Sequence, residues 1–141
     1  MIETATALDD TTSIRMALRT QKDVPLMVRK AKQMLVNAGF EYSIASLVAT
    51  AVSELSTNVI IHAGGGQLTL SLIERKERRG FEVIAEDEGP GISDIKQACT
   101  EGFSTAGSLG LGLAGVQRIM DEVDFDLDRT IGTRVRAIKW K

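Results

Sequence analysis

The pattern of apolar and polar positions at the start of the chain predicts a strand followed by a helix. From residue 13 to residue 19, apolar side chains alternate with polar ones, which indicates a strand with one buried face. Asp23 then suits a helix cap, with Pro25 in the first turn and Gly39 as the stop. Between them the apolar residues recur at helical spacing. The first 12 residues show no stable period, so we expect a flexible terminus there.

A longer apolar run follows and predicts a central, well-buried helix. It extends over residues 44–61, begins at Ser43 and meets three glycines at residues 64–66. The residues expected to serve the core lie on one side of this helix: Leu47, Ala51, Leu55 and Val59.

Two β-rich runs, at residues 67–73 and 81–86, predict a hairpin. The charged segment between them, residues 74–80, suggests a connecting loop longer than two residues. A glycine-rich segment from residue 89 to residue 112 comes next. We expect it to hold a short helix near residues 94–99 and a mobile loop at residues 100–108.

The remaining pattern predicts one more helix, at residues 109–122, and two closing strands, at residues 124–128 and 133–140. Helices interrupted by hairpin-like strand pairs, without regular βαβ alternation, favour an α/β two-layer sandwich. We expect a mixed, mostly antiparallel sheet with helices on one face. The length of 141 residues fits one domain, which we place at residues 13–141.

Composition narrows the setting of this domain. The net charge is −2, and the clearest basic cluster, at residues 75–79, is interrupted by Glu77, so it predicts a solvated hairpin tip and no nucleic-acid partner. We also expect no membrane span, since no apolar run is long and uninterrupted enough. The single cysteine, Cys99, allows no intrachain disulfide. These features predict a cytoplasmic protein.

Three polar residues stand in a row on the central helix, because Glu54, Asn58 and His62 are spaced by four. Asn58 offers a hard oxygen that suits a magnesium ion carried by nucleotide phosphates. Glu54, one turn earlier, could orient or deprotonate an attacking hydroxyl group. Alternatively, both side chains bond to the backbone of a neighbouring loop. For His62 the simpler interpretation is a histidine at a helix end that meets free carbonyl groups.

Asp87 stands where a β-rich run ends and a Gly-Pro-Gly turn begins. Its carboxylate could accept a hydrogen bond from the exocyclic amine of adenine, which would favour ATP over GTP. The alternative is a turn-forming aspartate, a common role for Asp near Gly.

A second glycine run leads into an apolar helix, where unpaired N–H groups can receive phosphate oxygens. Gly107, Gly110 and Gly112 would let the backbone approach the phosphates, and Ser104 and Thr105 would add hydroxyl contacts. No lysine stands in a Gly-Lys-Ser/Thr arrangement, so this segment is not a P-loop.

In these motifs the chain resembles the GHKL ATPase superfamily, which includes gyrase, Hsp90, histidine kinases and MutL. Residues 54–58 look like its asparagine-bearing helix motif, residues 87–91 its adenine-site motif, and residues 107–112 its phosphate-lid motif. Gly132-Thr133 matches its last small motif, in which the threonine supports the aspartate. The resemblance implies the Bergerat fold and ATP with Mg²⁺ as cofactors. It implies these nucleotide-binding residues: Asn58, Asp87, Gly89, Gly91, Ile92, Ser104, Thr105, Gly107, Gly110, Leu111, Gly112 and Thr133.

Within the superfamily the short form is similar to the anti-sigma-factor serine kinases, and residues 110–122 look like the RsbT-type stressosome switch kinases. This resemblance implies a serine/threonine kinase with Glu54 as the catalytic residue. It also implies STAS-domain scaffold or antagonist proteins as substrates, and a PP2C-type phosphatase or another output protein as the partner activated by binding. Two alternatives stay open: an anti-sigma factor that sequesters a sigma factor, and a nucleotide-gated docking module with little phosphotransfer.

Overall fold

The computed structural model describes residues 6–7, 13–87, 112–126 and 132–141. Two helices, α1 (Asp23–Asn37) and α2 (Tyr42–Ala63), follow the first strands, and α4 (Gly112–Ile119) lies between the later ones. The strands, in chain order, are β1 (Thr6–Ala7), β2 (Ser13–Leu18), β3 (Gly66–Arg75), β4 (Arg78–Asp87), β5 (Glu122–Asp126) and β6 (Arg134–Trp140).

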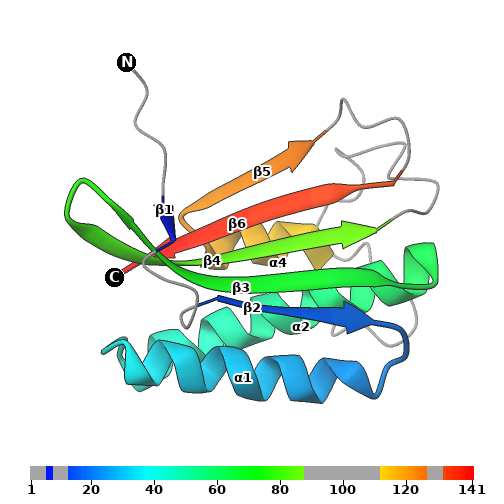
Figure 1. Cartoon of the computed structure of the whole chain (residues 1–141), viewed down its shortest axis with the longest axis horizontal. Coiled ribbons are helices and arrows are strands. Elements are labelled where there is room, and N and C mark those ends of the chain that lie inside the picture. Colours follow the sequence, from blue (N-terminus) through cyan, green and yellow to red (C-terminus); the bar gives the residue numbers. More distant parts are fainter. Residues whose placement is uncertain (1–5, 8–12, 88–111, 127–131) are drawn as a thin grey trace.

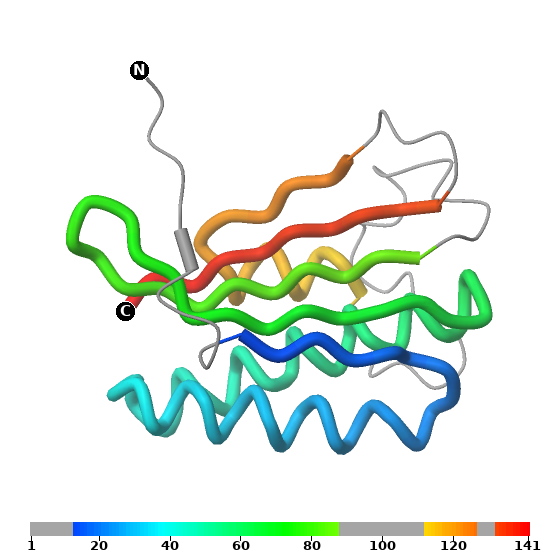
Figure 2. The backbone as a smooth tube through the Cα atoms, viewed as in Figure 1, coloured from blue at the N-terminus to red at the C-terminus, as the bar shows by residue number. Residues whose placement is uncertain are grey.

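The strands form one sheet in the order β1-β3-β4-β6-β5, and β2 also pairs with β3. Figure 2 shows the backbones of β2, β3, β4, β6 and β5 side by side, coloured from blue through green to red and orange. Every strand pairing in the described ranges is antiparallel. The register sets Asp87 at the end of β4, opposite Gly66, and Gly80 opposite Trp140 at the other end. The register therefore places Asp87 and Trp140 toward opposite ends of β4.

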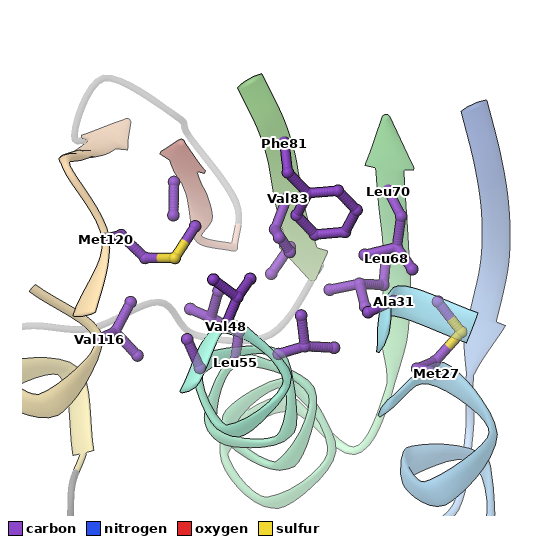
Figure 3. Packing of buried hydrophobic residues seen from close by; sticks show 14 of the residues in the cluster. Met27, Ala31, Val48, Leu55, Leu68, Leu70, Phe81, Val83, Val116 and Met120 are labelled. Atoms are coloured by element: carbon purple, nitrogen blue, oxygen red, sulfur yellow. The ribbon is translucent and has the colours of Figure 1, made fainter. Parts of the chain in front are cut away.

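The helices cover one face of the sheet, which gives two layers (Figure 1). The core lies between the layers, where alternate side chains of the strands meet the apolar sides of the helices (Figure 3). Phe81 and Val83 of β4 are fully buried there, as are Met27 of α1 and Val48 of α2. The predicted α/β sandwich is confirmed, with a sheet that is antiparallel throughout its described part.

The sequence pattern located most elements correctly. The strand predicted at residues 13–19 is β2. It lies within a few residues of its predicted position, as do the two long helices and the closing strands. α2 ends at Ala63, and Gly64 caps it in the left-handed conformation with a φ of 76°. The predicted short helix at residues 94–99 and the loop at residues 100–108 lie outside the described residues. Of the N-terminal 12, only β1 is described, paired with Ile73 and Glu74.

Two predictions about the first helix and the hairpin were wrong. Asp23 is the first residue of α1, and Lys22 holds the cap position without a side-chain cap bond. The Asp23 carboxylate instead accepts hydrogen bonds from the backbone N–H groups of Arg19 and Thr20 in the turn before the helix. The hairpin connection has only two residues, Lys76 and Glu77, with φ of 50° and 64°. These angles define a tight turn whose twist matches that of the strands.

Two further predictions need correction. Leu47 is 51% exposed and does not serve the core, although the other three residues named with it do. The last helix ends at Ile119, and Glu122 already belongs to β5. The chain leaves the helix here because the backbone N–H of Asp121 bonds to the carbonyl of Ile138 in β6.

α2 also satisfies the length and composition expected of a membrane span, with a mean hydropathy of 1.6. However, 56% of that span is buried inside the fold, as in a core helix. The described part of the chain therefore offers only weak grounds for a membrane segment.

Candidate nucleotide site

An open hollow lies between α2 and the adjoining ends of β4 and β6. Its polar lining comes from three of the predicted site residues, Asn58, Asp87 and Thr133, together with His62. Its walls are apolar: Leu55, Val59, Ala63, Ala85, Leu113 and Val135. An apolar slot with a few convergent polar groups is typical of a site for a small organic ligand.

Asp87 and Thr133 hold each other by two hydrogen bonds. The backbone N–H of Asp87 donates to the carbonyl of Thr133 at 3.0 Å, and the N–H of Thr133 donates to Oδ1 of the Asp87 carboxylate at 3.1 Å. Both residues are buried, with Asp87 only 9% exposed. This pair fixes the orientation of the carboxylate, so that a planar ligand in the hollow would meet a preset acceptor.

The antiparallel sheet produces this pairing. β4 ends at Asp87 and β6 begins at Arg134, so the residue before β6 lies beside the residue that ends β4. The period of two along a strand then directs Ala85 and Val135 to the same face as Asp87 and Thr133. Because the side chains of alanine and valine are small, the hollow extends beside the carboxylate.

α2 supplies the opposite wall. Asn58 is half-buried on this helix, and Leu55 and Val59 pack into the core while also lining the hollow. Glu54, one turn before Asn58, is 1% exposed and is not among the lining residues. It lies about 6 Å from Asn58 along the helix axis, from the rise of an α-helix.

The phosphate side of the predicted site is described only in part. Gly112 opens α4 with a φ of 57° and is buried, and the next residue, Leu113, lines the hollow. The first turn of α4 therefore faces the same hollow as Asp87. The other predicted contacts lie outside the described residues: Gly89, Gly91, Ile92, Ser104, Thr105, Gly107, Gly110 and Leu111.

The described residues fit adenine and a phosphate-borne magnesium ion. The fixed carboxylate of Asp87 suits an amine donor, and the apolar walls suit a planar ring. No cluster of three or more His, Cys, Asp or Glu side chains able to hold a metal occurs in the described ranges. The amide oxygen of Asn58 is a hard ligand of the kind that Mg²⁺ accepts beside phosphates and water.

Sequence reasoning missed the apolar walls and His62 as lining residues. Ala85 and Val135 could have been found, because each stands two residues from a predicted polar residue on the same strand face. Leu113 and Ala63 carry no comparable signal, since their positions depend on how α4 and the end of α2 pack over the sheet.

The fold and this site define a histidine kinase-like ATPase domain, whose family model matches residues 17–139. The chain belongs to that family. It is 36% identical to the serine/threonine-protein kinase RsbT of Bacillus subtilis (strain 168) over 133 residues, which are 94% of this chain and 98% of that protein.

Anti-sigma F factors are further relatives. The protein of Clostridium novyi (strain NT) is 34% identical over 97 residues, which cover 62% of this chain and 65% of that protein. The protein of Halalkalibacterium halodurans is 38% identical over 93 residues, which cover 62% and 64%. The predicted resemblance to this superfamily and its serine-kinase branch is confirmed, as is the prediction of a serine/threonine protein kinase.

Proposed function

We propose that the chain transfers phosphate from ATP, with Mg²⁺, to serine or threonine of a partner protein. The observation that carries this proposal is the fixed Asp87 carboxylate in the apolar hollow, beside the half-buried Asn58. The carboxylate would accept the adenine amine and so favour ATP over GTP. Similarity to RsbT over nearly the whole of both chains supports the kinase activity.

Asn58 would hold Mg²⁺ through its side-chain oxygen, and the ion would neutralise charge on the phosphates. The first turn of α4, with the glycines before it, would seat the phosphates, with Ser104 and Thr105 as hydroxyl donors. Glu54 would orient or deprotonate the incoming hydroxyl group. Catalysis would then rest mainly on positioning and charge neutralisation.

The substrates in this proposal are STAS-domain scaffold or antagonist proteins. After phosphorylating them, the chain would bind and activate a PP2C-type phosphatase or another output protein in the cytoplasm. The similarity to both RsbT and the anti-sigma F factors supports a regulator that exchanges protein partners.

The second candidate is an anti-sigma factor that sequesters a sigma factor and phosphorylates its antagonist. The anti-sigma F relatives favour it, but they align over about two thirds of this chain, whereas RsbT aligns over 94%. A pull-down with a purified sigma factor distinguishes the two, because only the anti-sigma factor would retain it. A docking module with little phosphotransfer is the third candidate.

The test is intact-mass spectrometry of a STAS-domain protein encoded beside this gene, incubated with the chain and Mg-ATP. We expect one added phosphate with the wild type and none with Glu54→Ala. As a control, calorimetry measures how the wild type and Glu54→Ala each bind ATP and the STAS protein. If the wild type and Glu54→Ala both bind ATP and the STAS protein but neither transfers phosphate, the kinase proposal for this substrate is wrong and the docking module is favoured.

A further inference from the structure

The large apolar side chains that remain exposed belong to the two long helices. In the part of the chain that the structure describes, they are Leu26 and Val36 of α1 and Tyr42 and Leu47 of α2. Figure 1 shows these helices side by side under the sheet and running in opposite directions. Since none of the four residues lies on a strand, this apolar surface belongs to the helical layer.

Leu47 stands in line with the proposed catalytic residue on α2. It precedes Glu54 by seven residues and Asn58 by eleven, and these spacings bring the three side chains to one side of the helix. The rise of an α-helix places Leu47 about 10 Å from Glu54 along the axis. Between them Thr50 is half-buried, and its hydroxyl donates to the carbonyl of Ser46 at 3.2 Å. The line therefore leads from an exposed apolar side chain to a buried carboxyl group.

α1 and its entry bring positive charge to this layer. Residues 19–53 contain five lysine or arginine side chains and only two carboxylates, although the whole chain has a net charge of −2. Of these carboxylates, Asp23 already accepts two hydrogen bonds from backbone N–H groups, and Glu41 stands before α2. The first 12 residues of α2, 42–53, carry no charge. The cations beside the start of α2 therefore come from α1.

Two of these cations lie on the side of α1 that approaches α2. Lys32 donates to the hydroxyl of Tyr42 at 2.7 Å, and its Nζ atom lies 4.2 Å from the centroid of that ring. Arg29 precedes Lys32 by three residues, so it shares this side of the helix, and it is exposed. Neither forms an ion pair with a residue that the structure describes. Because the helices are antiparallel, the step from Lys32 to Arg29 runs in the same direction as the step from Tyr42 to Leu47.

We propose that this surface docks the protein that receives the phosphate. We define the α1–α2 face as Arg29, Lys32, Tyr42 and Leu47. The inference rests on the proposed kinase function and assigns its protein-substrate surface. The partner segment would carry an apolar side chain that covers Leu47 and carboxylates that meet the two cations.

The geometry also sets where the phosphorylated residue lies in the partner. An extended chain rises about 3.3 Å per residue, so about three residues span the distance from Leu47 to Glu54. The Ser or Thr of the partner would therefore stand about three residues from the apolar side chain that covers Leu47. A second copy of this chain fits the α1–α2 face less well, because it would bring like charges together.

The test compares the wild type with Leu47→Ser and Arg29→Glu. The probe is the STAS-domain protein of the phosphotransfer assay, and calorimetry measures its binding to each form of the chain. The control for Leu47→Ser is Leu26→Ser, at an exposed leucine near the start of α1 and outside the α1–α2 face. The control for Arg29→Glu is Arg15→Glu, at an exposed arginine of β2. Both arginine variants change the net charge from −2 to −4, that is −2 − 2.

We expect Leu47→Ser to weaken binding of the STAS protein about five- to thirtyfold. Arg29→Glu should weaken it about three- to tenfold at about 50 mM salt and less at about 300 mM. The two controls should each change it less than about twofold, and ATP affinity should stay within about twofold of the wild type in every variant. In the transfer assay, Leu47→Ser should raise the KM for the protein substrate and leave kcat near the wild-type value.

Docking and phosphotransfer can fail separately in this experiment. Unweakened binding of the STAS protein by Leu47→Ser, or equal losses in Leu26→Ser and Leu47→Ser, would overturn the α1–α2 face even if phosphate is transferred. Binding by the wild type that Leu47→Ser weakens, without any transfer, would support the face as a docking site and contradict the kinase function. No binding by the wild type would overturn both. Self-association of the wild type that Leu47→Ser abolishes, measured by sedimentation, would assign the face to a second copy instead.

Discussion

The substitution Asp87→Asn separates the structural role of this residue from its proposed role in nucleotide recognition. The amide oxygen of asparagine can still accept the hydrogen bond from the Thr133 N–H, which is 3.1 Å in the wild type. The second carboxylate oxygen, however, becomes an NH₂ group. That group would face the adenine amine, donor against donor.

The expected magnitude follows from these contacts. A hydrogen bond to a charged group contributes about 1.5–3 kcal/mol, so its loss should weaken ATP binding by about 10- to 100-fold. The fold should change little, because the buried N–H of Thr133 keeps its acceptor. By contrast, Asp87→Ala leaves that N–H without its side-chain partner and should lower the free energy of unfolding by about 1–3 kcal/mol.

Calorimetric titration with Mg-ATP gives the affinity, and urea unfolding gives the stability. The predicted pattern is weak ATP binding with near-normal stability for the asparagine variant, and losses of both for the alanine variant. If the asparagine variant binds ATP within about twofold of the wild type, the carboxylate does not recognise adenine and the reasoning fails.

Three other predictions concern the framework. Gly80→Ala places a Cβ atom 2.7 Å from the Trp140 ring, so we expect a loss of about 1–3 kcal/mol in unfolding free energy and altered tryptophan fluorescence; unchanged spectra would contradict this contact. Leu55→Ala removes a buried side chain and should cost about 2–5 kcal/mol by urea unfolding, whereas a cost below about 1 kcal/mol would contradict the described core. Lys32 donates a hydrogen bond to the Tyr42 hydroxyl and, with its charge, lowers the pKa of that phenol from its usual 10.0. Lys32→Met should therefore raise the pKa of Tyr42, the single tyrosine, in an ultraviolet titration, and an unchanged pKa would refute the contact.

The elements with long or strictly alternating patterns could be predicted from sequence because burial alone decides them. The 22 residues of α2 and the paired runs of β3 and β4 are of this kind. The two-residue turn between the strands could not, because Lys76 and Glu77 both adopt positive φ without the usual glycine or asparagine. There the pairing of the strands outweighs the local preference of the residues.

The candidate site also has features that could be predicted from the sequence and features that could not. Asp87 stood out as a carboxylate at the end of a β-rich run, and Asn58 as an amide on a largely apolar helix. The structure brings both to one hollow. Their roles in binding ATP and Mg²⁺ remain predictions. The exposure of Leu47 could not be predicted, because it depends on which side of α2 the neighbouring layers leave uncovered. Helical periodicity shows which positions are apolar, but it does not show which of them the neighbouring elements cover.

The most direct test of the nucleotide site is a crystal structure of the chain with Mg²⁺ and a non-hydrolysable ATP analogue. We expect the adenine amine within about 3 Å of the Asp87 carboxylate, and the Asn58 oxygen at about 2.0–2.1 Å from the metal ion. A nucleotide bound outside the hollow, or a metal ion without Asn58 among its ligands, would contradict the proposed site.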